Sequence, residues 1–406
     1  FRTLRSLRHR NYRLLLLGNV LSHVGDFVQD IAQSWLVWHM TRSPFLLGLV
    51  GFFDTVPRLF FGVIGGALAD RIDRRRLMMW TQTMAMIQAF VYWIAVYFDF
   101  IRFWHVLLLC LFLGAVNSVN QIARQSLINT MVPKEDLLNA IALQSSAMNG
   151  AKIIGPSLGG IFIALVGIAG CFFINAVSFI AIIASLFLMT FAPTDKKVEK
   201  AGMWTEIQQG FRYVKASHGM LAIFFLSYVV ALMGAPYARF LPAVATNILH
   251  VGPAGYGFLM GAPGVGAASA ALFLAYLDIT PAVLLIASCA LGFSFSIALF
   301  AFSQSFVLSL LLLTLIGFFF MGFRALANTA IMTEAPPDLL GRILSLFFLD
   351  RGLLSLGALF IGGTASVVGV PWAFVIAASL CVLTASPIAF AAWKKQAVPV
   401  ALSSVE

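Results

Sequence analysis

The chain has 406 residues, of which 61% are hydrophobic and only 10% are charged, and its formal net charge is +10. A mean hydropathy of +0.94, with apolar runs that recur to the end of the chain, excludes a soluble globular domain. The composition therefore indicates an integral membrane protein.

The apolar runs are long enough to be membrane-spanning helices. A helix needs roughly 20 apolar residues to cross about 30 Å of hydrocarbon, and it satisfies its own backbone groups there. The first run follows the basic segment FRTLRSLRHRNYR and is too long for a signal-peptide core, so we expect it to be retained. In chain order, the sequence predicts twelve spans: 14–38, 45–68, 78–98, 103–131, 138–166, 168–191, 220–249, 256–277, 282–302, 306–332, 344–368 and 372–393.

The positive charge is distributed unevenly between the two sides of the membrane. With the N-terminus in the cytoplasm, the loops on that side hold 18 Lys and Arg residues, whereas the other side holds only Arg42 and Arg102. Cytoplasmic loops are enriched in Lys and Arg, so we expect both termini in the cytoplasm. This orientation accounts for the positive net charge, and we therefore expect no nucleic-acid partner. The cysteines all fall in apolar runs, which favours buried thiols over a disulfide framework: Cys110, Cys171, Cys289 and Cys381.

The second half of the sequence weakly repeats the first. A displacement of 203 residues aligns Pro133 with Pro336 and Gly160 with Gly363. Parallel six-helix repeats are typical of transporters that rock around a central site. We therefore expect a six-helix bundle over 1–191, a cytoplasmic linker with an amphipathic helix over 192–219, and a second six-helix bundle over 220–406.

A basic loop follows the second predicted span, in the segment GGALADRIDRRRLM. It resembles the loop between the second and third helices of the major facilitator superfamily, although Asp73 stands where that family usually has glycine. The resemblance implies the twelve-helix major facilitator fold. It also implies that the Asp70 carboxylate holds a cytoplasmic gate at a helix N-terminus of the other half, near residues 340–342. We assign to this gate Gly66, Asp70, Arg71 and Arg74. Arg124 and Arg324, which fall near the inner ends of the fourth and tenth predicted spans, are also assigned to it, with a structural role as their alternative. For Arg75 and Arg76 the alternative is that they only enforce orientation.

The fifth predicted span contains GAKIIGPSLGG, residues 150–160. This segment resembles the Gly-Pro-x-x-Gly-Gly motif of antiporters and exporters in the same superfamily. The motif residues are Gly155, Pro156, Gly159 and Gly160. Their alternative role is packing alone, because proline kinks a helix and glycine permits close helix approach. The N-terminal half is similar to the branch of enterobactin and macrolide exporters, which implies export.

Charged side chains inside the membrane are costly and are functional candidates by default. Asn19, His23, Asp26 and Asp30 share one helical face, and a carboxylate in a low dielectric suits proton exchange. We therefore place proton coupling at Asp26, with Asp30 as the second candidate; capping or pairing within the bundle is the structural alternative for Asp26. The substrate-cavity candidates are Asn19, His23, Asp54, Arg58, Lys152, Asp350 and Arg351, among which Asp54 and Arg58 are placed to pair along one helix.

These observations predict a secondary transporter that exports a small amphipathic molecule, a drug or siderophore, by proton antiport. The alternatives are uptake and lipid or lysolipid flipping. A membrane enzyme is disfavoured because no nucleophile motif occurs, and the six histidines show no metal-ligand spacing. We expect no cofactor and no metal. The expected partners are a small-molecule substrate, protons and the lipid bilayer of a bacterial-type cytoplasmic membrane, with the protein monomeric.

Overall fold

The computed structural model describes residues 2–57, 72–189, 211–277, 282–336 and 339–403, and every regular element in these ranges is helical. The elements in chain order are η1 (Arg2–Arg8), α1 (Arg10–Thr41), α2 (Pro44–Thr55), α4 (Arg74–Tyr97), α5 (Phe103–Met131), α6 (Lys134–Leu188), α8 (His218–Val229), η2 (Val230–Gly234), η3 (Ala235–Phe240), α9 (Leu241–Asn247), α10 (Pro253–Leu277), α11 (Val283–Ala301), α12 (Phe306–Glu334), α13 (Leu340–Phe348), α14 (Asp350–Val368) and α15 (Val370–Ser403).

The described part of each of the twelve predicted spans falls on a helix or on a run of consecutive helices, which confirms an all-α membrane fold. Residues 58–68 of the second span and 190–191 of the sixth lie outside the described residues. Within the described residues, seven helices are long and apolar enough to cross a membrane. One of them, α6, contains two predicted spans because the chain turns at Gly167, whose φ of +74° favours glycine. One labelled helix can therefore contain two membrane spans.

Short polar side chains fix where several helices begin. Ser43 accepts a hydrogen bond from the Leu46 amide at the start of α2, and Ser217 accepts one from the Met220 amide at the start of α8. Asp73 accepts a hydrogen bond from the Arg76 amide at 2.9 Å and so caps α4. The aspartate that departs from the family motif therefore acts as a helix cap.

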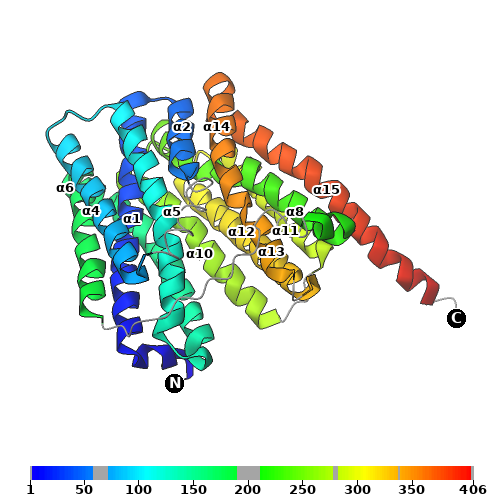
Figure 1. The fold of residues 1–406 in the computed structure, drawn as a ribbon. Helices are drawn as coiled ribbons and strands as arrows, with labels where there is room; N and C mark the ends of the chain where they lie inside the picture. Colours follow the sequence, from blue (N-terminus) through cyan, green and yellow to red (C-terminus); the bar gives the residue numbers. More distant parts are fainter. Residues whose placement is uncertain (1, 58–71, 190–210, 278–281, 337–338, 404–406) are drawn as a thin grey trace. The chain divides into compact units, whose positions relative to one another are not determined.

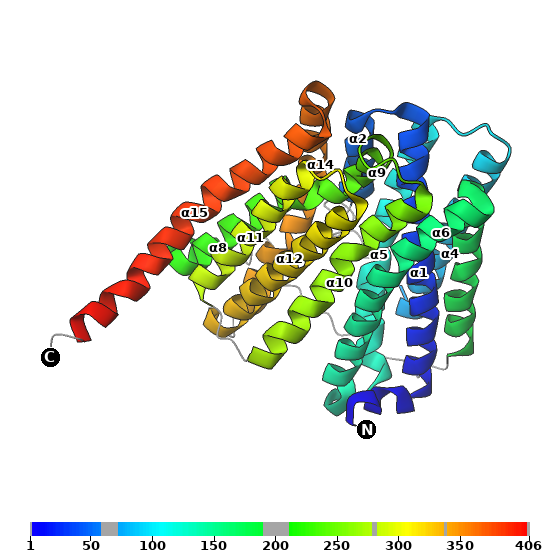
Figure 2. The same cartoon turned by 180° about the vertical axis from the view of Figure 1, so that it is seen from behind.

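The helices form two compact units. The N-terminal unit comprises Phe1–Glu199 with Leu241–Gly261, and the C-terminal unit comprises Lys200–Phe240 with Ala262–Glu406. In the N-terminal unit, α1, α4, α5 and α6 lie side by side (Figure 1 and Figure 2). Their shared core includes the buried side chains of Tyr12, Met78 and Phe179.

The N-terminal 3-10 segment η1 is fastened to the beginning of α6 rather than projecting away from the bundle. The buried Asp136 carboxylate lies 3.0 Å from Nε of Arg5 and 2.9 Å from Nε2 of His9. The Ser6 hydroxyl donates to Asn139 at 2.6 Å, and the Tyr12 hydroxyl donates to a carbonyl of the same helix turn. In both views the darkest-blue segment runs crosswise to α1 (Figure 1 and Figure 2).

Two predicted spans in the second half of the chain are interrupted helices. The span 220–249 contains the π turn η2 and the 3-10 turn η3, because Pro236 has no N–H to donate to the Leu232 carbonyl. A Cβ on Gly357 of α14 would lie 1.9 Å from that carbonyl oxygen, so only glycine fits there. The span 344–368 is divided between α13 and α14 at Leu349.

The internal repeat is visible in the helix boundaries. Both ends of α5 and α12 are displaced by the same 203 residues. The turn at Gly167 recurs at Gly369, where φ is +85° and the chain passes directly from α14 to α15. Two equivalent helix pairs therefore share one turn geometry, as expected for pseudo-symmetric six-helix bundles.

Candidate functional site

The polar face predicted on α1 is present, and its four members differ in exposure. Asn19 is buried, with 1% of its surface exposed, whereas His23 and Asp26 are partly exposed and Asp30 is exposed. Among the described residues, the Asn19 side-chain nitrogen has no hydrogen-bond partner. The face therefore runs from a buried amide to an accessible carboxylate.

Arg124 of α5 joins this face and forms a three-residue chain with His23 and Asp26. Its guanidinium contacts Nε2 of His23, and Nδ1 of the same ring lies 3.3 Å from Oδ2 of Asp26. A guanidinium only donates hydrogen bonds, so Nε2 must carry the lone pair and the imidazole proton must be on Nδ1, facing the carboxylate. We call this arrangement the Arg124–His23–Asp26 chain.

The register between α1 and α6 locates Lys152 relative to this chain. Tyr12 bonds the Ala140 carbonyl, and a Cβ on Gly155 would meet Phe27, so paired positions differ by 128 residues along these parallel helices. The same displacement sets Lys152 level with Val24, between His23 and Asp26 in height. The Lys152 side chain is exposed.

A buried amide network beside the chain was not predicted from the sequence. Asn175 donates to Gln29 at 2.9 Å, Gln29 donates to Gln88 at 3.1 Å, and Gln88 donates to the Leu109 carbonyl at 3.4 Å. All three amides are at most 2% exposed. The network joins α1, α4, α5 and α6, and its only trace in the sequence is three amide side chains within apolar runs.

Part of the predicted loop and cavity set lies outside the described residues, namely Arg58, Gly66, Asp70 and Arg71, and the Arg351 side chain is also not described. Asp54 is described on α2, where its backbone carbonyl faces Gly114 of α5.

On the described side of the basic loop, Arg74 is half-buried in the first turn of α4. Its neighbour Arg75 donates to the Leu186 carbonyl at 2.7 Å and to the Phe187 carbonyl at 3.0 Å. Arg75 therefore caps the C-terminal end of α6, a role beyond orientation.

The glycine motif of α6 packs against two different helices. Gly155 and Gly159 face α1, where added Cβ atoms would meet Phe27 and Val28. Gly160 faces the start of α10, and a Cβ there would lie 2.4 Å from the Pro253 carbonyl oxygen. The carbonyl of Pro156 lies against Gly257 in the same interface. The motif thus holds α6 between α1 and α10.

The C-terminal unit contains a second arginine cluster. Arg324 of α12, predicted as a gate residue, pairs with Asp350 of α14, predicted as a cavity residue. The guanidinium also lies 4.8 Å from the ring centre of Phe347 on α13. Asp350 is buried, with 2% of its side chain exposed. The structure therefore joins two residues that the sequence placed in different sites.

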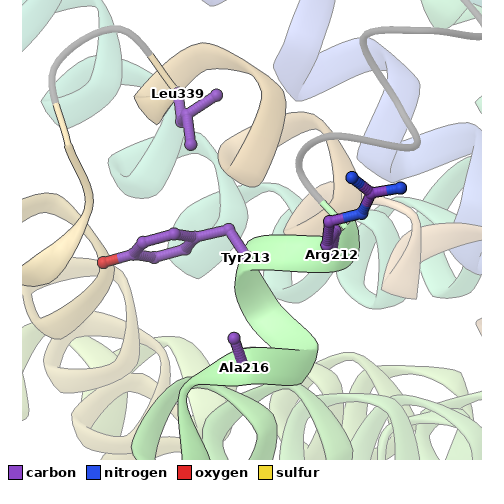
Figure 3. A pocket seen from close by; sticks show the side chains of 4 residues that line it. All are labelled: Arg212, Tyr213, Ala216 and Leu339. Carbon is purple, nitrogen blue, oxygen red and sulfur yellow. The ribbon is translucent and has the colours of Figure 1, made fainter.

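A separate cavity of about 410 Å³ lies in the C-terminal unit and is lined by Arg212, Tyr213, Ala216 and Leu339. In Figure 3 the Arg212 and Tyr213 side chains extend to opposite sides, and the Tyr213 hydroxyl donates to the Glu334 carbonyl at 3.1 Å. These residues belong to the helical stretch 211–216; the rest of the predicted amphipathic helix lies outside the described residues. Over the described parts of the chain, no group of His, Cys, Asp or Glu is arranged to hold a metal ion.

Membrane-spanning helices in two compact units, with paired charged side chains within each unit, are typical of a multi-pass membrane transporter. The family described as transmembrane secretion effector matches residues 2–401, and the chain belongs to this family of the major facilitator superfamily.

Similar proteins and structures are also transporters. The chain is 25% identical over 369 residues to the staphyloferrin A transporter of Staphylococcus aureus (strain NCTC 8325 / PS 47), covering 88% of this chain and 90% of that protein. It is 26% identical over 364 residues to the enterobactin exporter EntS of Shigella boydii serotype 4 (strain Sb227), covering 88% and 86%. A bacterial homolog of the human lysosomal transporter Spinster shares the fold with a TM-score of 0.75 and 13% identity, over 95% of this chain and 97% of that chain. A bacterial homologue of the iron transporter ferroportin does so with a TM-score of 0.68 and 17% identity, over 94% and 98%.

Proposed function

We propose that the protein exports a small amphipathic molecule across the cytoplasmic membrane in exchange for protons. This proposal rests on the Arg124–His23–Asp26 chain, because protonation of His23 or of Asp26 would change the contacts within it. A second proton on His23 would occupy Nε2 and oppose the guanidinium, and a proton on Asp26 would remove the charge that faces the ring. Either event changes the contact between α1 and α5.

The proposed direction and substrate class have two supports. One is the Gly-Pro-x-x-Gly-Gly resemblance of residues 155–160, and the other is the printed function of the relatives, of which one exports enterobactin and one transports staphyloferrin A. We therefore place the substrate among drugs and siderophores. The protein works as a monomer with both termini in the cytoplasm, and the linker 192–219 joins its two six-helix bundles.

The cytoplasmic gate of this proposal is the basic loop, with the Asp70 carboxylate at the helix N-terminus near residues 340–342. Asp70→Asn keeps the side-chain size but removes the charge, so transport slows while substrate affinity stays near normal. Rates from purified protein in vesicles and affinities from a binding titration separate the two effects. Equal transport rates for the two proteins would exclude this gate.

Purified protein in sealed vesicles tests the proton coupling. With an imposed pH gradient and enterobactin, staphyloferrin A or amphipathic dyes as substrates, the wild type should concentrate one of them against its gradient. Asp26→Asn should abolish this uphill transport and retain substrate exchange without a gradient. Asp30→Asn on the same helical face is the matched variant and should retain partial coupling.

Three outcomes would contradict the proposal. Uphill transport by Asp26→Asn would remove Asp26 from coupling. Movement of a fluorescent lysolipid, with no movement of any of the solutes, would favour lipid flipping. Accumulation of substrate inside the vesicles together with inward movement of protons would favour uptake.

A further inference from the structure

The eleventh predicted span is interrupted at one residue. α13 ends at Phe348 and α14 begins at Asp350, with Leu349 between them. There the Leu349 amide donates to the Leu346 carbonyl at 3.1 Å, and the Gly352 amide donates to the Leu349 carbonyl at 2.9 Å. These bonds span three residues instead of four, so the helix is interrupted while the chain remains hydrogen-bonded.

Two neighbouring helices hold this interruption with side chains. The Tyr228 hydroxyl of α8 donates to the Leu346 carbonyl at 2.9 Å. Arg324 of α12 contacts both sides of it, stacking on Phe347 of α13 and pairing with Asp350 of α14. One guanidinium therefore ties the two helical pieces together.

The charges in this arrangement are unequally buried. The Asp350 side chain is 2% exposed and that of Arg324 is 22% exposed, whereas Leu349 itself is 51% exposed. A buried carboxylate keeps its charge only when a cation balances it, and a neutral carboxyl no longer holds the guanidinium strongly. The contact that bridges the interruption thus depends on the charge of one buried group.

We infer that Asp350 carries a proton during transport, and that its pair with Arg324 is a latch on a hinge at Leu349. The inference rests on the proposed proton-coupled function and adds a carboxylate in the C-terminal unit to Asp26. When Asp350 is charged, Arg324 holds α13 in line against α12. When Asp350 takes up a proton, Arg324 releases it and α13 pivots about Leu349 while α14 stays in place.

The packing around α14 explains why only the α13 side moves. α14 packs against α15, η2 and η3, and Gly357 lies in backbone contact with η2. α13 is held to α8 by the Tyr228 hydroxyl on the Leu346 carbonyl and by the Phe224 ring against Phe347, and to α12 by Arg324 over the Phe347 ring. Other titratable and charged groups lie on the elements that pack against α13 and α14. They are His218 and Tyr228 on α8, Tyr237 and Arg239 on η3, Glu334 on α12, and Cys381, Lys394 and Lys395 on α15. α13 and α14 themselves carry Arg342 and Arg351 besides Asp350.

Distances between spin labels within the C-terminal unit test the hinge. One pair is placed at Gly341 on α13 and Met332 on α12, and the reference pair at Leu356 on α14 and Leu311 on α12; all four positions are exposed. The full chain is studied in lipid nanodiscs with its native cysteines replaced. As the pH is lowered from about 8 to the lowest value at which the protein stays folded, a second 341–332 distance should grow by about tenfold in population while the 356–311 distance stays constant.

Variants separate charge from packing. Asp350→Asn should show the second distance at both pH values. Tyr228→Phe removes an uncharged contact at the same interruption, so it should raise the population of the second distance at both pH values and leave its dependence on pH. The exchange of both partners, Arg324→Asp with Asp350→Arg, should restore the single distance at high pH. Hydrogen exchange on the unlabelled protein gives the same readout without cysteines, as faster exchange over residues 341–348 than over 353–368 at low pH.

The inference is overturned if the wild-type 341–332 distance is the same at every pH at which the protein stays folded, or if both label pairs move together. It is also overturned if Asp350→Asn matches the wild type at high pH. Asp26→Asn distinguishes the two proposals, because it should lose uphill transport and keep the pH response of α13.

Discussion

Gly160 of α6 and Gly257 of α10 pack backbone against backbone. A Cβ on Gly160 would lie 2.7 Å from Cα of Gly257, and a Cβ on Gly257 would lie 2.8 Å from Cα of Gly160. Real side chains do not approach backbone atoms this closely, so the contact exists only because both residues are glycine. The exporter-type motif and the start of α10 therefore depend on each other sterically.

Gly257→Ala should lower stability by about 1–3 kcal/mol, because the new methyl forces apart two helices that are already in contact. Thermal unfolding of the purified protein measures this loss. Gly150→Ala on α6 is the control, since nothing lies within 4 Å of a Cβ there, and it should leave stability unchanged or raise it slightly. Similar melting curves for both variants would remove the steric argument.

Replacement of His23 should depend on the hydrogen-bonding capacity of the new side chain. Gln can accept from Arg124 with its carbonyl and present N–H to Asp26, whereas Leu leaves the guanidinium without an acceptor. His23→Leu should therefore cost about 1–3 kcal/mol of unfolding free energy, and His23→Gln clearly less. Chemical denaturation followed by tryptophan fluorescence compares them. In vesicles, His23→Gln should bind substrate but transport it more slowly under a pH gradient, and equal losses in both variants would argue against the Arg124–His23–Asp26 chain.

Lys152 should bias binding toward anionic or carbonyl-rich ligands, because the register between α1 and α6 places this cationic residue at the same height as His23 and Asp26. Lys152→Met should weaken binding of anionic ligands by about tenfold and leave cationic ligands within about twofold. Lys152→Arg preserves the charge and should restore most of the anion affinity. Titrations with matched anionic and cationic dyes test this, and a loss that ignores ligand charge would make Lys152 a structural residue.

Asp136 should hold the N-terminal segment against α6. Asp136→Asn removes the charge that faces Arg5 and His9, so trypsin should cleave after Arg8 and Arg10 faster by on the order of tenfold. Glu135→Gln removes the neighbouring, exposed carboxylate and should cleave like the wild type. Quantification of the intact protein by mass spectrometry follows the cleavage. Equal rates in all three proteins would show that the ion pairs do not hold the segment.

The sequence predicted what depends on periodicity and on local order. Apolar runs located the spans, and spacings of three and four residues placed Asn19, His23 and Asp26 on one face of α1. Contacts between helices leave no such local signal. The pairing of Arg324 with Asp350, and of Arg124 with His23, joins residues that are far apart in sequence. The amide network of Gln29, Gln88 and Asn175 was missed for the same reason.

The helix breaks were also beyond local reasoning. Pro236 marks the interruption near η2, but the accommodation of the freed carbonyl depends on Gly357, which is more than 100 residues away. The break at Leu349 has neither proline nor glycine at its centre. It is held by Tyr228 and Arg324, which only the folded chain brings to it.

The turns at Gly167 and Gly369 each replace an interhelical loop with a single residue. Two helices joined in this way cannot slide past each other or separate at that end, because the connection offers only the two backbone dihedrals of one glycine. Within each pair, 134–188 and 350–403, the two helices are therefore fixed to each other at the glycine, and their freedom to separate increases with distance from it. A residue with a side chain at either position would have to adopt the left-handed backbone region that glycine occupies there. Amino-acid substitutions are therefore tolerated least at Gly167 and Gly369.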